Sequence, residues 1–230
     1  MKKPNLTVLL VILMVIVFLV GYGQNLKKQS QNGTVGLCQD KALQIIEAKE
    51  ILPLGDSNAP LLIEVYSDYQ CPFCANYFVE TITPIIDEYV NTERARLIYQ
   101  DLAFEGERSQ WASEAAHCAN DQEKFWEYHQ AILGERYTSG KTDVYKKDSL
   151  KKIAKEIGLD ECEFNICFDS GKYTQIVKDA TKVGFDEKGI NGTPTTLFNG
   201  EMVTNDEGKN IGAMSYDIFK EKINKTIQNL

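Results

Sequence analysis

The sequence predicts an α/β fold in which a strand–helix–strand unit and a later strand–strand–helix unit flank a long helical block. Three observations lead to this class. A run of β-favouring residues at 61–66 leads into a segment with helical periodicity, and a second such run follows at 95–102. Residues 109–182 are then dominated by helical patterns. A short hairpin pattern at 195–204 precedes a closing amphipathic segment at 215–229.

The first unit follows a short helix that we predict over residues 39–52, where apolar residues recur at helical spacing. Residues 61–66 (LLIEVY) are bounded by turn formers and predict a buried central strand. Helical spacing over 72–90 predicts a helix, in which Pro84 introduces a kink. Residues 95–102 (ARLIYQDL) predict the second strand. Such a unit is right-handed, and its two strands are parallel.

The helical block contains several predicted segments. Residues 109–120 are rich in alanine, and residues 124–133 (KFWEYHQAIL) are rich in aromatic side chains. A polar break over 134–148 separates these from further helices predicted over 149–158 and 161–184.

The last unit begins with a short strand predicted at 195–198. Asn199-Gly200 is a typical hairpin turn, and residues 201–204 return from it. We expect this hairpin to join the same sheet in the antiparallel sense. Residues 215–229 predict an amphipathic helix that Ser215 caps.

The N-terminal residues are typical of a targeting segment. Two lysines precede a run at 6–20 that has no charge and only Thr7 as a polar side chain. The run extends to about 18 residues, near the lower limit for a membrane span. A cleaved signal peptide and a retained membrane anchor both fit, and the absence of an Ala-x-Ala site favours the anchor. In either case the rest of the chain is expected outside the cytoplasmic membrane.

These patterns divide the chain into a targeting segment, a tether and an interrupted α/β domain. The predicted parts are a signal peptide or membrane anchor at 1–23, a polar tether at 24–38, the two portions of the α/β domain at 39–107 and 185–230, and the helical insertion at 108–184.

Charge and cysteine content narrow the class of function. The net charge of −8 argues against a nucleic-acid partner. Six cysteines are an even number, and in an exported chain they predict disulfides before metal ligation.

The sequence Cys71-Pro72-Phe73-Cys74 lies directly after the first strand and opens a predicted helix. Unpaired N–H groups and the helix dipole favour a thiolate at the first cysteine, so the pKa of Cys71 should fall and its nucleophilicity should rise. Cys74 lies one turn further into the helix and is placed to resolve a mixed disulfide formed at Cys71. Pro72 suits the first turn of a helix.

Two structural readings of this pair compete with the redox reading. A zinc site needs a second set of ligands with local spacing. The remaining candidates are scattered over the helical block without a second C-x-x-C: His117, Cys118, His129, Cys162 and Cys167. A purely structural bond between Cys71 and Cys74 would close too short a loop to stabilise much. We therefore predict a redox pair and no metal.

Four stretches of the chain together resemble one family, the DsbA-like thiol-disulfide oxidoreductases. They are 67–74 (SDYQCPFC), 115–128 (AAHCANDQEKFWEY), 167–173 (CFDSGKY) and 192–198 (GTPTTLF). They span most of the exported part in the order and spacing of the family, and the chain looks most like its membrane-tethered branch. The resemblance implies a thioredoxin-like fold with an inserted all-helical domain, catalytic residues Cys71 and Cys74, and no soluble cofactor.

The resemblance also implies a substrate-binding loop. Thr193-Pro194 is expected to face the active site with Pro194 in cis, and its backbone is expected to pair with the substrate chain. Pro72 and Phe73, between the two cysteines, are expected to complete this substrate contact. Phe73 cannot hydrogen-bond a thiolate as the histidine of some relatives does, which predicts a less oxidising pair.

One position departs from the family pattern. Relatives carry a buried acid six residues before the first cysteine, where this chain has Val65; its acid, Glu64, stands one residue earlier. On a strand this offset turns the side chain to the opposite face. Either Glu64 does not serve the site or a bulge realigns it, and Asp68 is an alternative.

The other four cysteines allow three pairings. As in some members of the family, we predict a disulfide between Cys118 and Cys167, which leaves Cys38 and Cys162 as the second pair. Cys118–Cys162 together with Cys38–Cys167 is the rival arrangement.

For the two histidines and the aromatic residues of the insertion, the sequence predicts structural rather than catalytic roles. We expect His117 and His129 on helix surfaces rather than at a catalytic site. The large aromatic residues are expected in the core of the insertion, with a rim beside Cys71 as the alternative. They are Trp111, Phe125, Trp126 and Tyr128.

The sequence therefore predicts an exported, membrane-tethered oxidase that passes disulfides to reduced client proteins through Cys71. The family implies re-oxidation by a quinone-linked membrane partner of the DsbB or VKOR type. The alternatives are a disulfide reductase or isomerase, disfavoured by the absence of a dimerisation module, and a non-catalytic thioredoxin-fold binding module. We expect the protein at the outer face of the cell membrane, or in a secreted or periplasm-like space if the signal peptide is cleaved.

Overall fold

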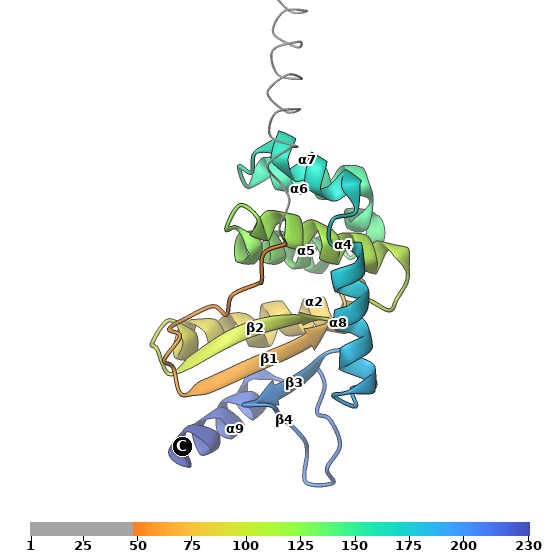
Figure 1. The fold of residues 1–230 in the computed structure, drawn as a ribbon. Coiled ribbons are helices and arrows are strands. Elements are labelled where there is room, and N and C mark those ends of the chain that lie inside the picture. Colours follow the sequence, from red (N-terminus) through yellow and green to blue (C-terminus); the bar gives the residue numbers. More distant parts are fainter. Residues whose placement is uncertain (1–47) are drawn as a thin grey trace, which may run out of the picture. The chain divides into compact units, whose positions relative to one another are not determined.

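The computed structural model describes residues 48–230, and Figure 1 shows the arrangement of their helices and strands. The order along the chain is β1 (Leu61–Ser67), α2 (Pro72–Tyr77), η1 (Phe78–Ile82), α3 (Thr83–Ile85), η2 (Ile86–Val90), β2 (Ala95–Asp101), α4 (Glu107–Asn120), α5 (Phe125–Ser139), η3 (Thr142–Tyr145), α6 (Lys147–Glu156), α7 (Glu161–Ser170), α8 (Thr174–Asp186), β3 (Thr195–Phe198), β4 (Glu201–Met202) and α9 (Tyr216–Gln228). The predicted strand–helix–strand unit, helical block and strand–strand–helix unit all form.

The described strands form one mixed sheet in the order β2-β1-β3-β4. β1 and β2 are parallel, with Leu61 opposite Ala95, and β3 runs antiparallel to β1. Asn199 and Gly200 both take positive φ, 49° and 85°, as a two-residue hairpin between β3 and β4 requires. The predicted parallel pair and antiparallel hairpin are confirmed.

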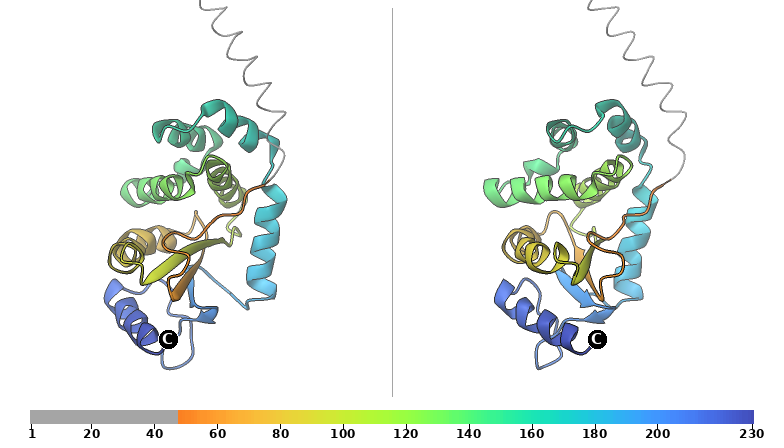
Figure 2. Two further views of the ribbon diagram at one scale, coloured as in Figure 1. Left: turned by 60° about the vertical axis from the view of Figure 1, so that its left-hand side comes forward. Right: turned by 90° about the vertical axis from the view of Figure 1, so that its left-hand side faces the viewer.

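The two faces of β1 pack against different layers. Ile63 and Val65 lie in the main core, which includes Phe78 from the helix after β1 and Phe219 from α9. On the other face Tyr66 forms a smaller cluster with Leu102, Ile190 and Leu197, against which Phe185 of α8 packs. Figure 2 shows α8 and the layer of α2 and α9 on opposite sides of the strands. Burying a large apolar side chain contributes roughly 1.5–3 kcal/mol, so both layers hold the central strand in place.

The helix that follows β1 is irregular around Pro84. It runs from α2 through two π-helical turns, η1 and η2, which lie on either side of the three-residue segment α3. Proline has no N–H to donate, and a wider turn is one way in which a helix accommodates a missing hydrogen bond.

The helices α4 to α8 form the insertion between β2 and β3. Its core is rich in fully buried aromatic rings, including Tyr128, Phe164 and Phe168. Phe125 is buried as well, and the half-buried Trp111 and Trp126 pack against the same core. The prediction that these aromatic residues build the core of the insertion is confirmed.

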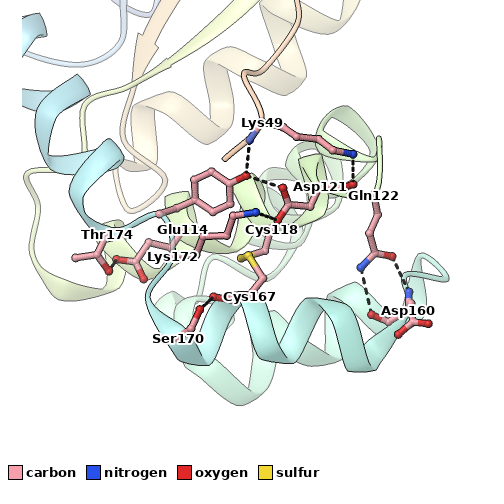
Figure 3. The surroundings of a disulfide bond; sticks show 11 residues. Lys49, Glu114, Cys118, Asp121, Gln122, Asp160, Cys167, Ser170, Lys172 and Thr174 are labelled. Carbon is pink, nitrogen blue, oxygen red and sulfur yellow. Dashed lines mark hydrogen bonds and ion pairs between the residues drawn. A yellow bond between two sulfur atoms is a disulfide. The ribbon is translucent and has the colours of Figure 1, made fainter. Parts of the chain in front are cut away.

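A disulfide joins α4 to α7 inside this block. The sulfurs of Cys118 and Cys167 are 2.03 Å apart, and both side chains are buried (Figure 3). Beside it Asp121 accepts hydrogen bonds from Lys172 and from the hydroxyl group of Tyr173. The rival pairing of Cys118 with Cys162 is therefore not the one formed. Cys38 lies outside the described residues, so its bond to Cys162 stays a prediction.

Three sequence predictions on helix boundaries were wrong. The helix predicted over 39–52 does not extend through residues 48–52, which are not helical. The chain there runs beside the sheet, because Leu54 forms two backbone hydrogen bonds with Leu97 of β2, of 2.7 and 2.9 Å. α5 continues to Ser139 and ends at Gly140 with φ 66°, because the polar residues predicted as a break face solvent on a helix that is already anchored. The segment predicted as one helix over 161–184 is broken at Gly171, whose φ of 67° ends α7.

The targeting segment predicted at 1–23 and the tether at 24–38 lie outside the described residues. Within residues 48–230, no helix combines the length and the apolar character that a membrane crossing requires.

Candidate active site

The first predicted cysteine lies at the junction of β1 and α2. Cys71 is the N-cap residue of α2, in an extended conformation, and Pro72 takes the first helical position. The carbonyl group of Cys71 accepts the N–H of Cys74 at 3.1 Å. Pro72 has no N–H, and the N–H of Phe73 has no partner one turn earlier in the helix, so the latter is free to face the Cys71 sulfur.

The environment of Cys71 favours its thiolate. The pKa of this thiol is lowered from 9.0 to about 6, chiefly by a hydrogen bond from the thiol of Cys74. Burial opposes the shift, while the neighbouring Thr193 side chain and the backbone N–H groups of Phe73 and Cys74 support it. The thiol itself reaches the carbonyl oxygen of Thr193 at 3.6 Å. Cys71 is only 3% exposed.

Cys74 has the opposite character. Its side chain is 1% exposed, and burial raises the pKa of its thiol well above the ordinary value. The hydrogen bond to Cys71 and the Cys71 charge act in the same direction, while Ser67 and the backbone of Asp68 oppose it. Both cysteines are free thiols here. The pair therefore consists of one acidic sulfur and one that stays protonated.

The loop before β3 completes the site. The Thr193–Pro194 peptide bond is cis, as the resemblance implied. Asn210 braces the loop, since its Nδ2 atom donates to Thr195 Oγ1 at 2.6 Å, and Thr195 Oγ1 in turn donates to the carbonyl of Gly192 at 2.7 Å. The Oγ1 atom of Thr193 is buried and has no hydrogen-bond partner within the described part of the chain. It is thus available to the neighbouring Cys71 sulfur.

The position at which relatives carry a buried acid, Val65 in this chain, lies beside Cys74. Val65 and Ser67 line a small cavity of about 10 Å³ beside Cys74, whereas Glu64 points to the other face of β1, where its charge acts on Tyr66. The strand has no bulge at this point, so Glu64 is not realigned towards the site and does not serve it. Asp68 does not replace it: its carboxylate is fully used elsewhere, and only its backbone contacts Cys74.

The prediction that both histidines lie on helix surfaces was wrong. His129 is 2% exposed, lines the cavity beside Cys74, and shares a hydrogen bond of 2.7 Å with the Tyr69 hydroxyl group. Burial lowers the pKa of His129 to about 3, so its ring is neutral. His117 is also buried and pairs with Asp101 at 2.7 Å. A sequence signal existed for His129, since Phe125, His129 and Ile132 follow the spacing of a buried helix stripe.

Sequence reasoning missed the role of the loop between β2 and α4. Asp68 is fully buried and accepts the N–H groups of Phe104 and Glu105, each at 2.9 Å, on one carboxylate oxygen. Its other oxygen accepts the N–H of Gln70 and the hydroxyl group of Ser109. This carboxylate fastens the loop to the residues that precede Cys71, a link between segments more than 30 residues apart that no local pattern reveals.

Two phenylalanines are exposed near the cysteine pair. Phe73 is 65% exposed and Phe104 is 46% exposed. Phe104 packs edge-to-face on Phe185 of α8, with ring centroids 5.4 Å apart. Phe73 lies between the two cysteines, and Asp68 accepts the N–H of Phe104, so both segments adjoin the residues at the start of α2.

Comparison with known proteins gives the family. A family model described as thioredoxin matches residues 47–224. The chain is also 22% identical over 202 residues to the probable disulfide bond formation protein D of Bacillus anthracis. The aligned region covers 83% of this chain and 84% of that relative. The chain belongs to the thioredoxin family, among the DsbA-like thiol-disulfide oxidoreductases.

Solved DsbA-like structures share this fold. Wolbachia pipientis alpha-DsbA1 is similar with a TM-score of 0.67 at 20% identity, over 82% of this chain and 96% of that one. BdbD from Bacillus subtilis is similar with a TM-score of 0.63 at 20% identity, over 76% of this chain and 92% of that one. At these identities the likeness establishes the thioredoxin-like fold with its helical insertion.

Proposed function

We propose that this DsbA-like protein is an exported oxidase that introduces disulfides into client proteins, with Cys71 and Cys74 as its catalytic pair. The observation that carries the proposal is the asymmetry of the two thiols. The pKa of Cys71 is lowered to about 6, while burial raises that of Cys74 far above the ordinary value. A dithiol whose reduced form contains a stabilised thiolate gives up its disulfide readily, which makes the oxidised form an oxidant.

The reaction proceeds by two exchanges. A client thiolate attacks Cys71 in the Cys71–Cys74 disulfide; the bond between the two cysteines breaks, and Cys74 leaves and takes up a proton. A second client thiolate then attacks the client sulfur of the mixed disulfide, and Cys71 leaves as a thiolate. The client loses two electrons, which the cysteine pair gains.

Client binding follows from the groups around Cys71. The Thr193–Pro194 loop lies at the Cys71 sulfur and offers backbone groups to an extended client chain. Pro72, Phe73 and the exposed Phe104 offer apolar contact. A client that is still unfolded presents both extended backbone and apolar side chains, so this surface suits reduced chains before they fold.

The cycle requires a second partner. The reduced pair must pass two electrons to an acceptor, and the family implies a membrane re-oxidase of the DsbB or VKOR type. The N-terminal segment supports export to the outer face of the cell membrane, where such a partner would be met. The relative from Bacillus anthracis is named for disulfide bond formation, in agreement with this direction of electron flow.

The test compares oxidation with reduction in the same preparation. Oxidised protein is mixed with a reduced, unfolded client, and regain of client activity is measured beside insulin reduction. We expect client oxidation to be abolished in both Cys71→Ser and Cys74→Ser, because neither variant can form the Cys71–Cys74 disulfide. Unchanged client oxidation in Cys71→Ser would reject the mechanism. Insulin reduction without client oxidation would assign the protein as a reductase instead.

A further inference from the structure

A short hairpin follows β4 and ends beside the Thr193–Pro194 loop. Residues 204–210 form it, and an isolated bridge between Thr204 and Asn210 closes it. At its end the side-chain amide of Asn210 donates to the Thr195 hydroxyl group at 2.6 Å and to the carbonyl oxygen of Pro194 at 3.4 Å. One side chain therefore joins this hairpin to the loop at the active site.

Thr195 carries the contact across the loop. Its hydroxyl group, which accepts from the asparagine amide, donates in turn to the carbonyl oxygen of Gly192 at 2.7 Å. These two hydrogen bonds in series span the Thr193–Pro194 loop, whose first carbonyl oxygen lies 3.6 Å from the Cys71 sulfur. Hydrogen bonds that are linked in this way strengthen one another. The position of the loop at the sulfur thus depends on a side chain from a later part of the chain.

The segment that carries Asn210 is itself held in place. The Oδ1 atom of Asn210 accepts the N–H of Gly212 at 3.1 Å, which fixes the orientation of its amide group. Further on, the carbonyl oxygen of Met214 accepts the hydroxyl group of Thr81 at 2.9 Å, and Thr81 belongs to η1, which continues the helix that Cys71 caps. Asn210 is therefore anchored to the same helical segment as the cysteine pair.

We propose that Asn210 is a positioning residue for client exchange, which holds the backbone of the Thr193–Pro194 loop where an extended client chain pairs with it at Cys71. Because the carbonyl oxygen of Pro194 already has the asparagine amide as its donor, the client finds its backbone partner at Thr193. The inference rests on the proposed function, since it concerns how a client chain reaches the reacting sulfur.

Loss of this contact should affect a peptide and a small thiol differently. A peptide that pairs with the loop must order it first if the loop is loose, and this ordering weakens binding. Dithiothreitol has no peptide groups, so it attacks Cys71 without pairing with the loop. In both reactions a thiolate attacks Cys71 and Cys74 leaves, so the comparison separates positioning of the chain from reactivity of the sulfur.

The experiment measures how fast an excess of a short, unstructured peptide with one cysteine reduces the oxidised protein, beside reduction by dithiothreitol. In Asn210→Ala we expect the peptide reaction to slow by about three- to tenfold, mainly through a higher half-saturation concentration, as the loss of one or two hydrogen bonds implies. Reduction by dithiothreitol should change by less than about twofold, because the sulfur itself is not altered.

Thr195→Val tests the hydrogen bonds in series. It interrupts the same connection at its middle, so we expect a similar slowing of the peptide reaction alone. The double variant Asn210→Ala/Thr195→Val should be no slower than the slower single variant, since both changes remove one shared connection. Independent, multiplying effects of the two substitutions would overturn the inference.

Asn205→Ala is the matched control. Asn205 is an asparagine of the same hairpin, but its Oδ1 atom accepts only from the N–H groups of Glu207 and Lys209, each at 3.0 Å. We expect both reactions to match the wild type. If Asn210→Ala behaves like Asn205→Ala, or slows both reactions equally, the inference is overturned. A client with two cysteines that never emerges oxidised from the wild-type protein would instead reject the proposed function, while the ratio of the two reduction rates still tests Asn210.

Discussion

Replacing Asp68 by asparagine tests whether one buried carboxylate holds the active-site segments together. Asp68 is fully buried, and its two oxygens accept four hydrogen bonds, from Gln70, Phe104, Glu105 and Ser109. Asparagine has nearly the same shape, but one of its two terminal groups is an amide that donates. The substitution therefore changes hydrogen bonding with little change in packing.

The magnitude follows from the geometry. If the amide group faces Phe104 and Glu105, two buried N–H groups lose their acceptor. If it faces the other side, the Ser109 hydroxyl group turns to accept from it, and only the N–H of Gln70 is orphaned. Each orphaned buried donor costs about 1–3 kcal/mol, and hydrogen bonds to a charged acceptor are the stronger kind, so we expect a loss of about 2–4 kcal/mol.

Urea unfolding of the oxidised protein at neutral pH measures this loss. Ser109→Ala serves as the control, because it removes one of the four donors and leaves the carboxylate in place; we expect a loss of about 1 kcal/mol there. A stability for Asp68→Asn within about 1 kcal/mol of the wild type would refute the reasoning, since it would mean that water satisfies these groups.

Three further predictions concern the disulfide, the pH dependence of stability and the client surface. The double substitution Cys118→Ala/Cys167→Ala opens a loop with a sequence separation of 49 residues and should cost about 4 kcal/mol in urea unfolding, while alkylation of Cys71 stays unchanged. Because the folded pKa of Cys71 is lowered from 9.0 to about 6, its ionisation stabilises the reduced protein at alkaline pH and ceases to do so as the pH falls towards 6. The stability of the reduced form relative to the oxidised form should therefore increase from about pH 7 to about pH 8.5, and a constant difference in calorimetry would contradict this. Phe73→Ala/Phe104→Ala should slow oxidation of an unfolded client by roughly tenfold without slowing exchange with glutathione, and equal slowing of both would exclude an apolar client contact.

The local pattern of the sequence determined the framework of this site. An apolar run before C-x-x-C predicts the strand and the helix that place Cys71 at a helix start, and Pro72 at the next position agrees with it. Asn199-Gly200 predicts the hairpin because few other residue pairs tolerate positive φ at both positions. The alternation of β1 was enough to separate Val65 from Glu64. Each of these features depends on residues within a few positions of one another.

Tertiary structure alone decided which groups surround the two sulfurs. His129 carries a sequence signal for burial, but only packing brings it into the cavity beside Cys74. Asp68 and Glu105 lie 37 residues apart, and Leu54 pairs with β2 across a similar distance along the chain. Such contacts depend on how the sheet and the insertion pack, and many different residues satisfy the same local pattern. The sequence thus predicts which sulfur reacts, whereas the acidity of that sulfur is set by neighbours that only the folded chain assembles.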